Sequence, residues 1–161
     1  MDVEDDGIDI AVAAFRDAAG WHVEDLTHDH LIDIETLADA LRRFPGENGA
    51  LGMVAIDEDF FVLVRVEGAV TRVLLSDITA ADDWDIASSA VEHLGLPQPE
   101  DDDDVVPAGR LDLLSDLGIA PAELGDLLDD DELYPDEMLS DVARLLGFGE
   151  QFDALVGLTS A

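Results

Sequence analysis

Two histidines and a nearby carboxylate are the first residues whose types suggest chemistry, because they could bind a metal ion. His28 and His30 are separated by one residue, and Asp25 stands just upstream. Imidazole nitrogens and carboxylate oxygens are ligands for zinc and other divalent ions. A zinc site normally takes its further ligands from distant parts of the sequence, where neighbouring apolar residues fix their position. His22 and His93 have no such apolar neighbours that would mark them as these ligands. We therefore interpret the stretch as a solvated loop, and a small metal-dependent hydrolase using His28 and His30 remains the less favoured alternative.

Two further patterns suggest chemistry but have simpler structural explanations. Ser76 and Asp77 follow a predicted strand, where a nucleophile could lie, but no glycine-framed elbow surrounds them. We expect Ser76 or Asp77 to bind backbone donors in the turn or at the start of the next helix. The acidic runs 101–104 and 126–132 offer oxygen ligands for calcium, yet 126–132 lacks the glycine that an EF-hand loop requires. We predict no catalytic residue, no metal site and no cofactor, and hence no enzyme.

The composition excludes several classes of mechanism. All seven cations among the 161 residues are arginines, and the chain contains no lysine and no cysteine. P-loop and Schiff-base chemistry need a lysine, whereas thiol catalysis, disulfides and Fe–S clusters need cysteine. The 40 carboxylates give a formal net charge of −33. This charge repels nucleic acid and anionic lipid headgroups, and it favours a basic protein partner.

The chain combines this charge with enough apolar residues to fold. Hydrophobic residues make up 48% of the sequence and the mean hydropathy is +0.12, so a core can be buried. No stretch approaches the ~18 uninterrupted apolar residues of a membrane-spanning helix. The first ten residues are acidic where a signal peptide is basic, so we expect a cytoplasmic protein. The surface of a halophile is an alternative explanation of the acidity, without functional content.

Five short stretches of the first 96 residues have the pattern of β-strands. They are apolar or alternate between apolar and polar residues, at 8–15, 21–25, 51–56, 60–67 and 71–76. The last three are joined by short connections, which require antiparallel neighbours. The nearly continuous apolar run at 61–66 is typical of a central strand buried on both faces. Arg65 within this run therefore needs a carboxylate partner or an exit to solvent.

Two helices complete the pattern of the first part of the chain. One is predicted over 34–41 with Asp33 or Thr36 as its cap, and another from Asp82 or Asp83 to about residue 94. The order β-β-α-β-β-β-α predicts an α+β fold with one five-stranded antiparallel sheet. Profilin-like, longin-type and roadblock-type domains have this order of elements. Such domains are mostly scaffolds, so the order does not identify a reaction.

An acidic linker separates this part from the rest of the chain. Residues 97–109 contain three prolines around a run of carboxylates, the composition of an extended, self-repelling linker. From Arg110 onward the apolar residues have helical spacing, which predicts three or four short helices. We therefore divide the chain into an α+β domain at 1–96, the linker at 97–109 and a small helical region at 110–161. Residues 97–161 contain 18 carboxylates and two arginines.

Several blocks together carry a resemblance to a known family. The sequence FVLVRV from Phe61 and the sequence RVLLSD from Arg72 resemble the tRNA adenosine deaminase-associated proteins of actinobacteria. Further blocks that resemble the family in the same order lie at 13–16, 113–118, 122–124, 133–137 and 145–148, and Trp21 agrees as well. The resemblance implies association with the deaminase, and it defines no catalytic residues that could be carried over to this chain.

Charge and resemblance together predict a non-enzymatic acidic interaction protein that binds or regulates a tRNA adenosine deaminase. Such a deaminase must present a cationic surface to tRNA phosphates, and carboxylates can dock there. An acidic mimic of nucleic acid, directed at another basic protein, is the alternative. The residues expected to bind the partner are aromatic anchors and a run of acids, namely Tyr134, Phe148, Trp84, Asp129, Asp130, Asp131 and Glu132. Core packing is the other interpretation of the three aromatic residues.

Overall fold

A computed structural model describes eleven segments of the chain, at 8–17, 20–26, 33–43, 49–56, 60–67, 70–78, 81, 84–95, 108–109, 111–128 and 135–156. The strands in these segments are β1 (Ile8–Asp17), β2 (Gly20–Asp25), β3 (Ala50–Ile56), β4 (Phe60–Glu67), β5 (Val70–Leu75) and β6 (Ala108–Gly109). The helices are α1 (Ile34–Leu41), α2 (Asp85–His93), the 3₁₀ helix η4 (Leu111–Leu117), α3 (Pro121–Leu128), α4 (Pro135–Leu146) and α5 (Gly149–Val156). The fold is therefore α+β.

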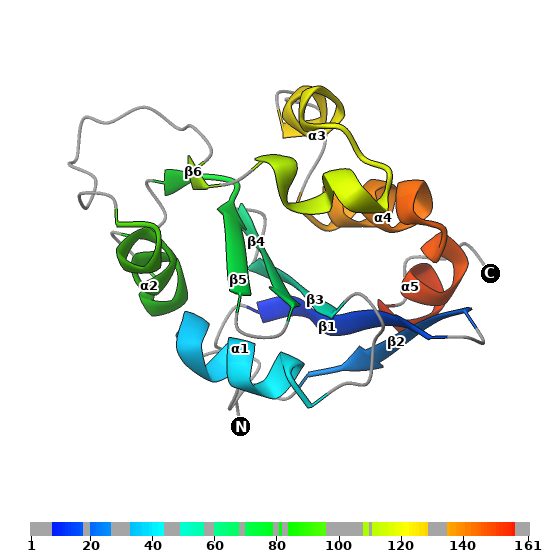
Figure 1. The fold of residues 1–161 in the computed structure, drawn as a ribbon, viewed down its shortest axis with the longest axis horizontal. Coiled ribbons are helices and arrows are strands. Elements are labelled where there is room, and N and C mark those ends of the chain that lie inside the picture. Colours follow the sequence, from blue (N-terminus) through cyan, green and yellow to red (C-terminus); the bar gives the residue numbers. More distant parts are fainter. Residues whose placement is uncertain are drawn as a thin grey trace.

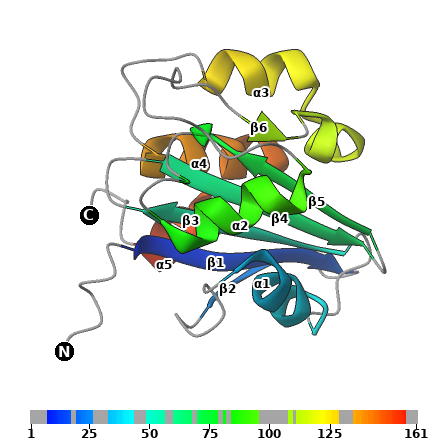
Figure 2. The same cartoon turned by 90° about the vertical axis from the view of Figure 1, so that its left-hand side faces the viewer.

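The strands form one antiparallel sheet with helices on both faces (Figures 1 and 2). The sheet order is β2-β1-β3-β4-β5-β6, and each neighbouring pair is antiparallel. Helices α1 and α2 cover one face and form the layer that we call the α1/α2 layer. Helices η4, α3, α4 and α5 lie on the other face and form the tail layer. The predicted antiparallel sheet is thus confirmed, between two layers of helices.

Strand β4 shows why both faces need a cover. Seven of its eight residues are buried, and successive side chains point to opposite faces of a strand. Phe60 and Val62 enter the core of the α1/α2 layer, whereas Phe61 and Leu63 enter the core of the tail layer. The prediction of a central strand buried on both faces is confirmed.

Helix α1 begins where the sequence indicates. The carboxylate of Asp33 accepts a hydrogen bond from the backbone N–H of Thr36 at 2.8 Å, so Asp33 is the predicted cap. The hydroxyl of Ser89 in α2 accepts from the backbone N–H of Ile34 at 2.9 Å and ties the two helices together at this end. Leu37 and Leu41 are buried against the sheet.

The tail layer shares its core with the sheet. Helix α4 buries Met138, Leu139, Val142 and Leu146, which lie on one face of the helix, in the same cluster as Leu63 of β4. The helical region predicted at 110–161 therefore packs on the sheet in its described residues. The first of its helices, η4, is a 3₁₀ helix.

Strand β6 extends the sheet beyond the five predicted strands. Ala108 and Gly109, the last two residues of the predicted linker, pair with Leu75 and Leu74 of β5. Gly109 has φ +119°, and a Cβ there would lie 2.2 Å from the carbonyl oxygen of Val73. The position therefore requires glycine. This strand lies within the predicted linker, and a two-residue strand has no periodicity that a sequence could reveal.

Arg65 joins the sheet to the tail layer. Its side chain is 1% exposed, and one guanidinium nitrogen lies 3.4 Å from a carboxylate oxygen of Glu67. A second guanidinium nitrogen of Arg65 donates to the backbone carbonyl of Leu113 in η4 at 2.9 Å. Glu67 also pairs with Arg72 at 2.7 Å. The predicted need for a carboxylate partner is confirmed, and the backbone bond holds η4 against β4.

Candidate protein-interaction site

An open groove runs between α3 and α4 in the tail layer. Helix α3 lies at the outer edge of the molecule (Figures 1 and 2). The volume of the groove is about 420 Å³. Among the described residues, three from each helix line it, namely Glu123, Asp126, Leu127, Asp141, Arg144 and Leu145. Four of these six side chains are charged and two are leucines.

The spacing of the lining residues explains why they share one surface. In α3 they stand at i, i+3 and i+4 counted from Glu123, and in α4 at i, i+3 and i+4 counted from Asp141. Residues with this spacing are neighbours on a helix surface. The inner faces of the helices are fixed by Leu124 in α3 and Val142 in α4, both completely buried. Helix α3 therefore presents two carboxylates and a leucine to the groove, and α4 presents one carboxylate, one arginine and a leucine.

The surface of the groove is apolar at the leucines and acidic around them. Leu145 is 53% exposed and is, with Val70, one of two exposed large hydrophobic residues among those described. Glu123 accepts a hydrogen bond from the backbone N–H of Ala120 at 3.1 Å and so caps α3. Arg144 forms an ion pair with Asp141. The groove thus has a local excess of negative charge.

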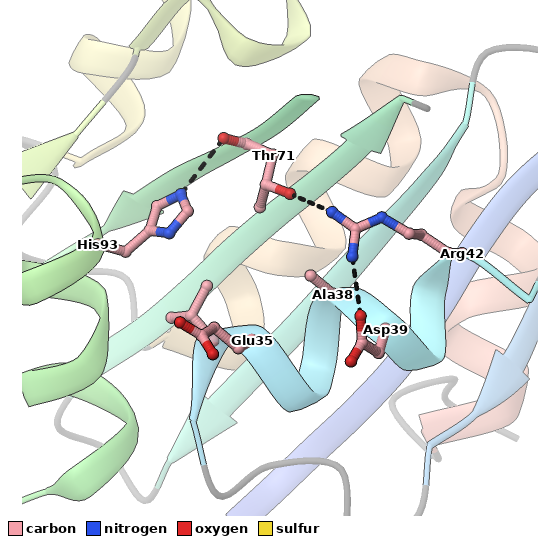
Figure 3. Close-up of a pocket in the computed structure, with 7 residues that line it drawn as sticks. Glu35, Ala38, Asp39, Arg42, Thr71 and His93 are labelled. Carbon is pink, nitrogen blue, oxygen red and sulfur yellow. Dashed lines mark hydrogen bonds and ion pairs between the residues drawn. The ribbon is translucent and has the colours of Figure 1, made fainter. Parts of the chain in front are cut away.

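A second cavity, of about 290 Å³, lies between α1 and α2 beside the start of β5 (Figure 3). Arg42 donates to Asp39 at 2.9 Å and to the hydroxyl of Thr71 at 3.1 Å. The Nε2 atom of His93 lies 3.4 Å from the backbone oxygen of Thr71. A nucleophilic hydroxyl is activated by a neighbouring base. Here the hydroxyl accepts from a guanidinium and the imidazole contacts the carbonyl, so this arrangement is a polar cross-link.

The structure places two of the predicted anchors in the two core clusters. Phe148 is completely buried, and its ring centroid lies 4.7 Å from that of Trp21. Trp84 precedes α2 and is partly buried, with its ring centroid 6.1 Å from that of Phe60. A partner can therefore contact the exposed part of Trp84, whereas Phe148 is too buried in this structure to be contacted.

The other predicted binding residues lie outside the described segments. These residues are Tyr134, Asp129, Asp130, Asp131 and Glu132. They belong to the stretch 129–134, which follows the last residue of α3 and precedes the first residue of α4. The predicted acidic binding segment therefore connects in sequence the two helices that line the groove.

The residues considered for catalysis have separate outcomes. His28 and His30 lie outside the described segments. The hydroxyl of Ser76 accepts a hydrogen bond from the backbone N–H of Phe61 at 2.9 Å, so it binds a backbone donor as predicted, although this donor lies in strand β4 and not in the turn. In the part of the chain that the structure describes, no group of three or more His, Asp or Glu could hold a metal ion.

Nor is any helix in those segments long and apolar enough to cross a membrane.

The groove itself was not predicted from the sequence. The helical spacing of the apolar residues after Arg110 does not show which leucines stay exposed, and the acidic run 126–132 was considered only as a calcium site. The signal that could have identified the groove is the repeated spacing of a carboxylate followed by a leucine four residues later, in both helices.

Comparison with known proteins identifies the family. The model of the Rv3753c-like tRNA adenosine deaminase-associated protein family matches residues 9–149. The protein Rv3753c of Mycobacterium tuberculosis (strain ATCC 25618 / H37Rv) is 38% identical over 154 residues, which cover 94% of this chain and 88% of that protein. No solved structure matches the chain with statistical significance. The family description names association with a deaminase, in agreement with the resemblance found in the sequence. The chain belongs to the Rv3753c-like tRNA adenosine deaminase-associated protein family.

Proposed function

We propose that this chain is a non-enzymatic interaction protein that binds a basic partner through the acidic surface of its tail layer, and that the partner is a tRNA adenosine deaminase. The observation that carries the proposal is the groove between α3 and α4, where exposed Leu145 shares the lining with three carboxylates and one arginine. The net charge of −33 and the description of the family support it.

The physical reason lies in how an enzyme binds tRNA. Protein surfaces that bind nucleic acid carry lysine and arginine to neutralise phosphates. An acidic protein can occupy the same cations, so the proposal includes competition with tRNA and regulation of the deaminase. Attraction between opposite charges gives fast, salt-sensitive association, whereas apolar anchors contribute most of the specificity. The proposal places the protein in the cytoplasm, where it would meet the deaminase.

The test is direct binding between the purified chain and the deaminase of the same organism. We expect binding at about 50 mM NaCl that weakens at least about tenfold at 300 mM, because salt screens charges near the surface. Lysozyme, a basic protein of unrelated function, serves as the control for nonspecific attraction and is expected to bind more weakly. Absence of binding to the deaminase at low salt would overturn the proposal. Equal binding to lysozyme would leave only a general affinity for basic proteins, as expected of the alternative, an acidic mimic.

A further inference from the structure

We infer that the groove between α3 and α4 is a docking site for an amphipathic helix of the partner, rich in lysine or arginine on its polar face. The inference rests on the proposed function, since both take the partner to be a basic protein. It adds the surface that is used, the shape of the segment that is bound and the residue that anchors it.

The shape of the groove favours a helix. Its two walls are themselves helices, eight residues long for α3 and twelve for α4. An amphipathic helix places apolar residues at i, i+3, i+4 and i+7 on one face, and this face lies along a hydrophobic groove. Leu127 and Leu145 are the apolar contacts that such a face would meet. The opposite side of α3 is already packed, since a Cβ at Gly125 would contact Leu111 of η4 at 3.7 Å.

The charge of the groove selects among the possible occupants. Glu123, Asp126 and Asp141 line the groove together with the leucines, and the single cation among the described lining residues, Arg144, is paired with Asp141. A second copy of this chain would bring another net charge of −33 to these carboxylates, which is repulsive. The segment 129–132 of the chain itself consists of four acids, whose charge has the same sign as that of the groove. A cationic segment of another protein fits the groove.

The exposure of Leu145 is the second reason for an occupant at this place. Leu145 is 53% exposed between two helices, so covering it with an apolar side chain of a partner would lower the free energy of the complex. Anchors of this kind dominate the affinity of an interface, whereas charges at the rim mainly raise the rate of association. Leu145 is therefore expected to determine how tightly the helix is held, and Asp126 how strongly binding depends on salt.

The experiment titrates the ¹⁵N-labelled full chain with a synthetic peptide of about 14 residues that has leucines at i, i+3, i+4 and i+7 and lysines elsewhere. A peptide of the same composition with scrambled order is the control for charge alone. At about 150 mM NaCl we expect chemical-shift changes that concentrate in α3 and α4, and at least about fivefold weaker binding of the scrambled peptide. Shift changes spread evenly over the acidic surface would overturn the inference.

Matched variants test the anchor and the charge separately. Leu145→Gln removes the exposed leucine of the groove and is expected to weaken peptide binding about tenfold. Val70→Gln removes the other exposed hydrophobic residue, which is 50% exposed and lies in β5, and is expected to change binding less than twofold. Asp126→Asn is expected to reduce the salt dependence more than Glu92→Gln, a change of an exposed acid in α2. Wild-type affinity in Leu145→Gln would contradict the inference.

The same variants separate this inference from the proposed function. If the deaminase binds the wild type, Leu145→Gln and Val70→Gln with equal affinity, the proposed function stands and the groove is not the docking site. If the peptide binds in the groove while the deaminase does not bind the wild type, the groove stands and the proposed partner is wrong. Leu145 lies at the surface, so we expect Leu145→Gln to keep the fold. An unchanged melting temperature of this variant serves as the check.

Discussion

The two layers that cover the sheet differ in what they leave exposed. The α1/α2 layer closes its face with apolar side chains, and its cavity is spanned by the bonds of Arg42 to Asp39 and Thr71. The tail layer closes the other face and also presents an acidic groove with exposed Leu145 to solvent. One layer therefore serves mainly to complete the core, whereas the other combines a core with the surface that we propose for a partner.

The largest expected effect tests whether the tail layer is part of one cooperative core. Phe148→Ala removes a completely buried ring from the tail layer and is expected to lower the free energy of unfolding by about 3–5 kcal/mol. Phe60→Ala removes a completely buried ring from the other layer and serves as the matched variant, with a similar loss.

The two tryptophans allow each layer to be followed separately. Trp21 packs against Phe148 and Trp84 against Phe60. Urea unfolding of variants that keep only one tryptophan measures the stability of each side. Coincident transitions at Trp21 and Trp84 are expected, and both shift in Phe148→Ala. If only the Trp21 signal shifts, the tail layer unfolds by itself and the comparison of two layers in one core is wrong.

A smaller effect is expected at the bond between the sheet and the tail layer. Arg65→Met keeps much of the volume of the side chain but removes the donor to the Leu113 carbonyl, which costs about 1–3 kcal/mol. Arg72→Met is the control, because the Arg72 side chain is 34% exposed, and its loss is expected to cost less than about 1 kcal/mol. If Arg65→Met and Arg72→Met lower the free energy of urea unfolding equally, the hydrogen bond from Arg65 to the Leu113 carbonyl does not add to stability.

The smallest effect is expected at the start of α1, away from the tail layer. Asp33→Ala removes the bond to the backbone N–H of Thr36 and should cost about 1 kcal/mol in a thermal or urea unfolding experiment. Asp33→Asn keeps an oxygen acceptor and is expected to retain most of the stability. Neither variant should alter binding of the peptide, and a loss of binding would show that the α1/α2 layer takes part in the interface.

Local signals predicted much of the sheet. The strand expected at 60–67 is β4 with the same bounds, and the cap at Asp33 is in place. Alternation of apolar residues and side-chain caps are local properties of the sequence, so they can be recognised without the fold. Strand β6 could not be predicted in this way, since its two residues pair with β5 only after the chain between them has folded back.

The site was predicted less well, for a physical reason. In α4 the sequence places Leu145 directly beside Leu146, yet Leu145 is 53% exposed and Leu146 is 8% exposed. Which leucine faces the sheet depends on the rotation of the helix in its layer, and the hydrophobic period alone does not fix it for neighbouring residues. Phe148 lies between α4 and α5 and is completely buried, in agreement with core packing, the other interpretation of this aromatic residue. Composition indicated an acidic partner-binding protein, whereas only the packed helices locate the groove.

Hydrogen exchange of the chain with and without the purified deaminase tests the central claim most directly. The account predicts that amides of α3 and α4 become protected in the complex, whereas those of α1 and α2 keep the exchange rates of the free chain. Protection confined to α1 and α2 would contradict the claim that the tail layer binds the partner. The absence of any protection with the deaminase in excess would contradict it as well.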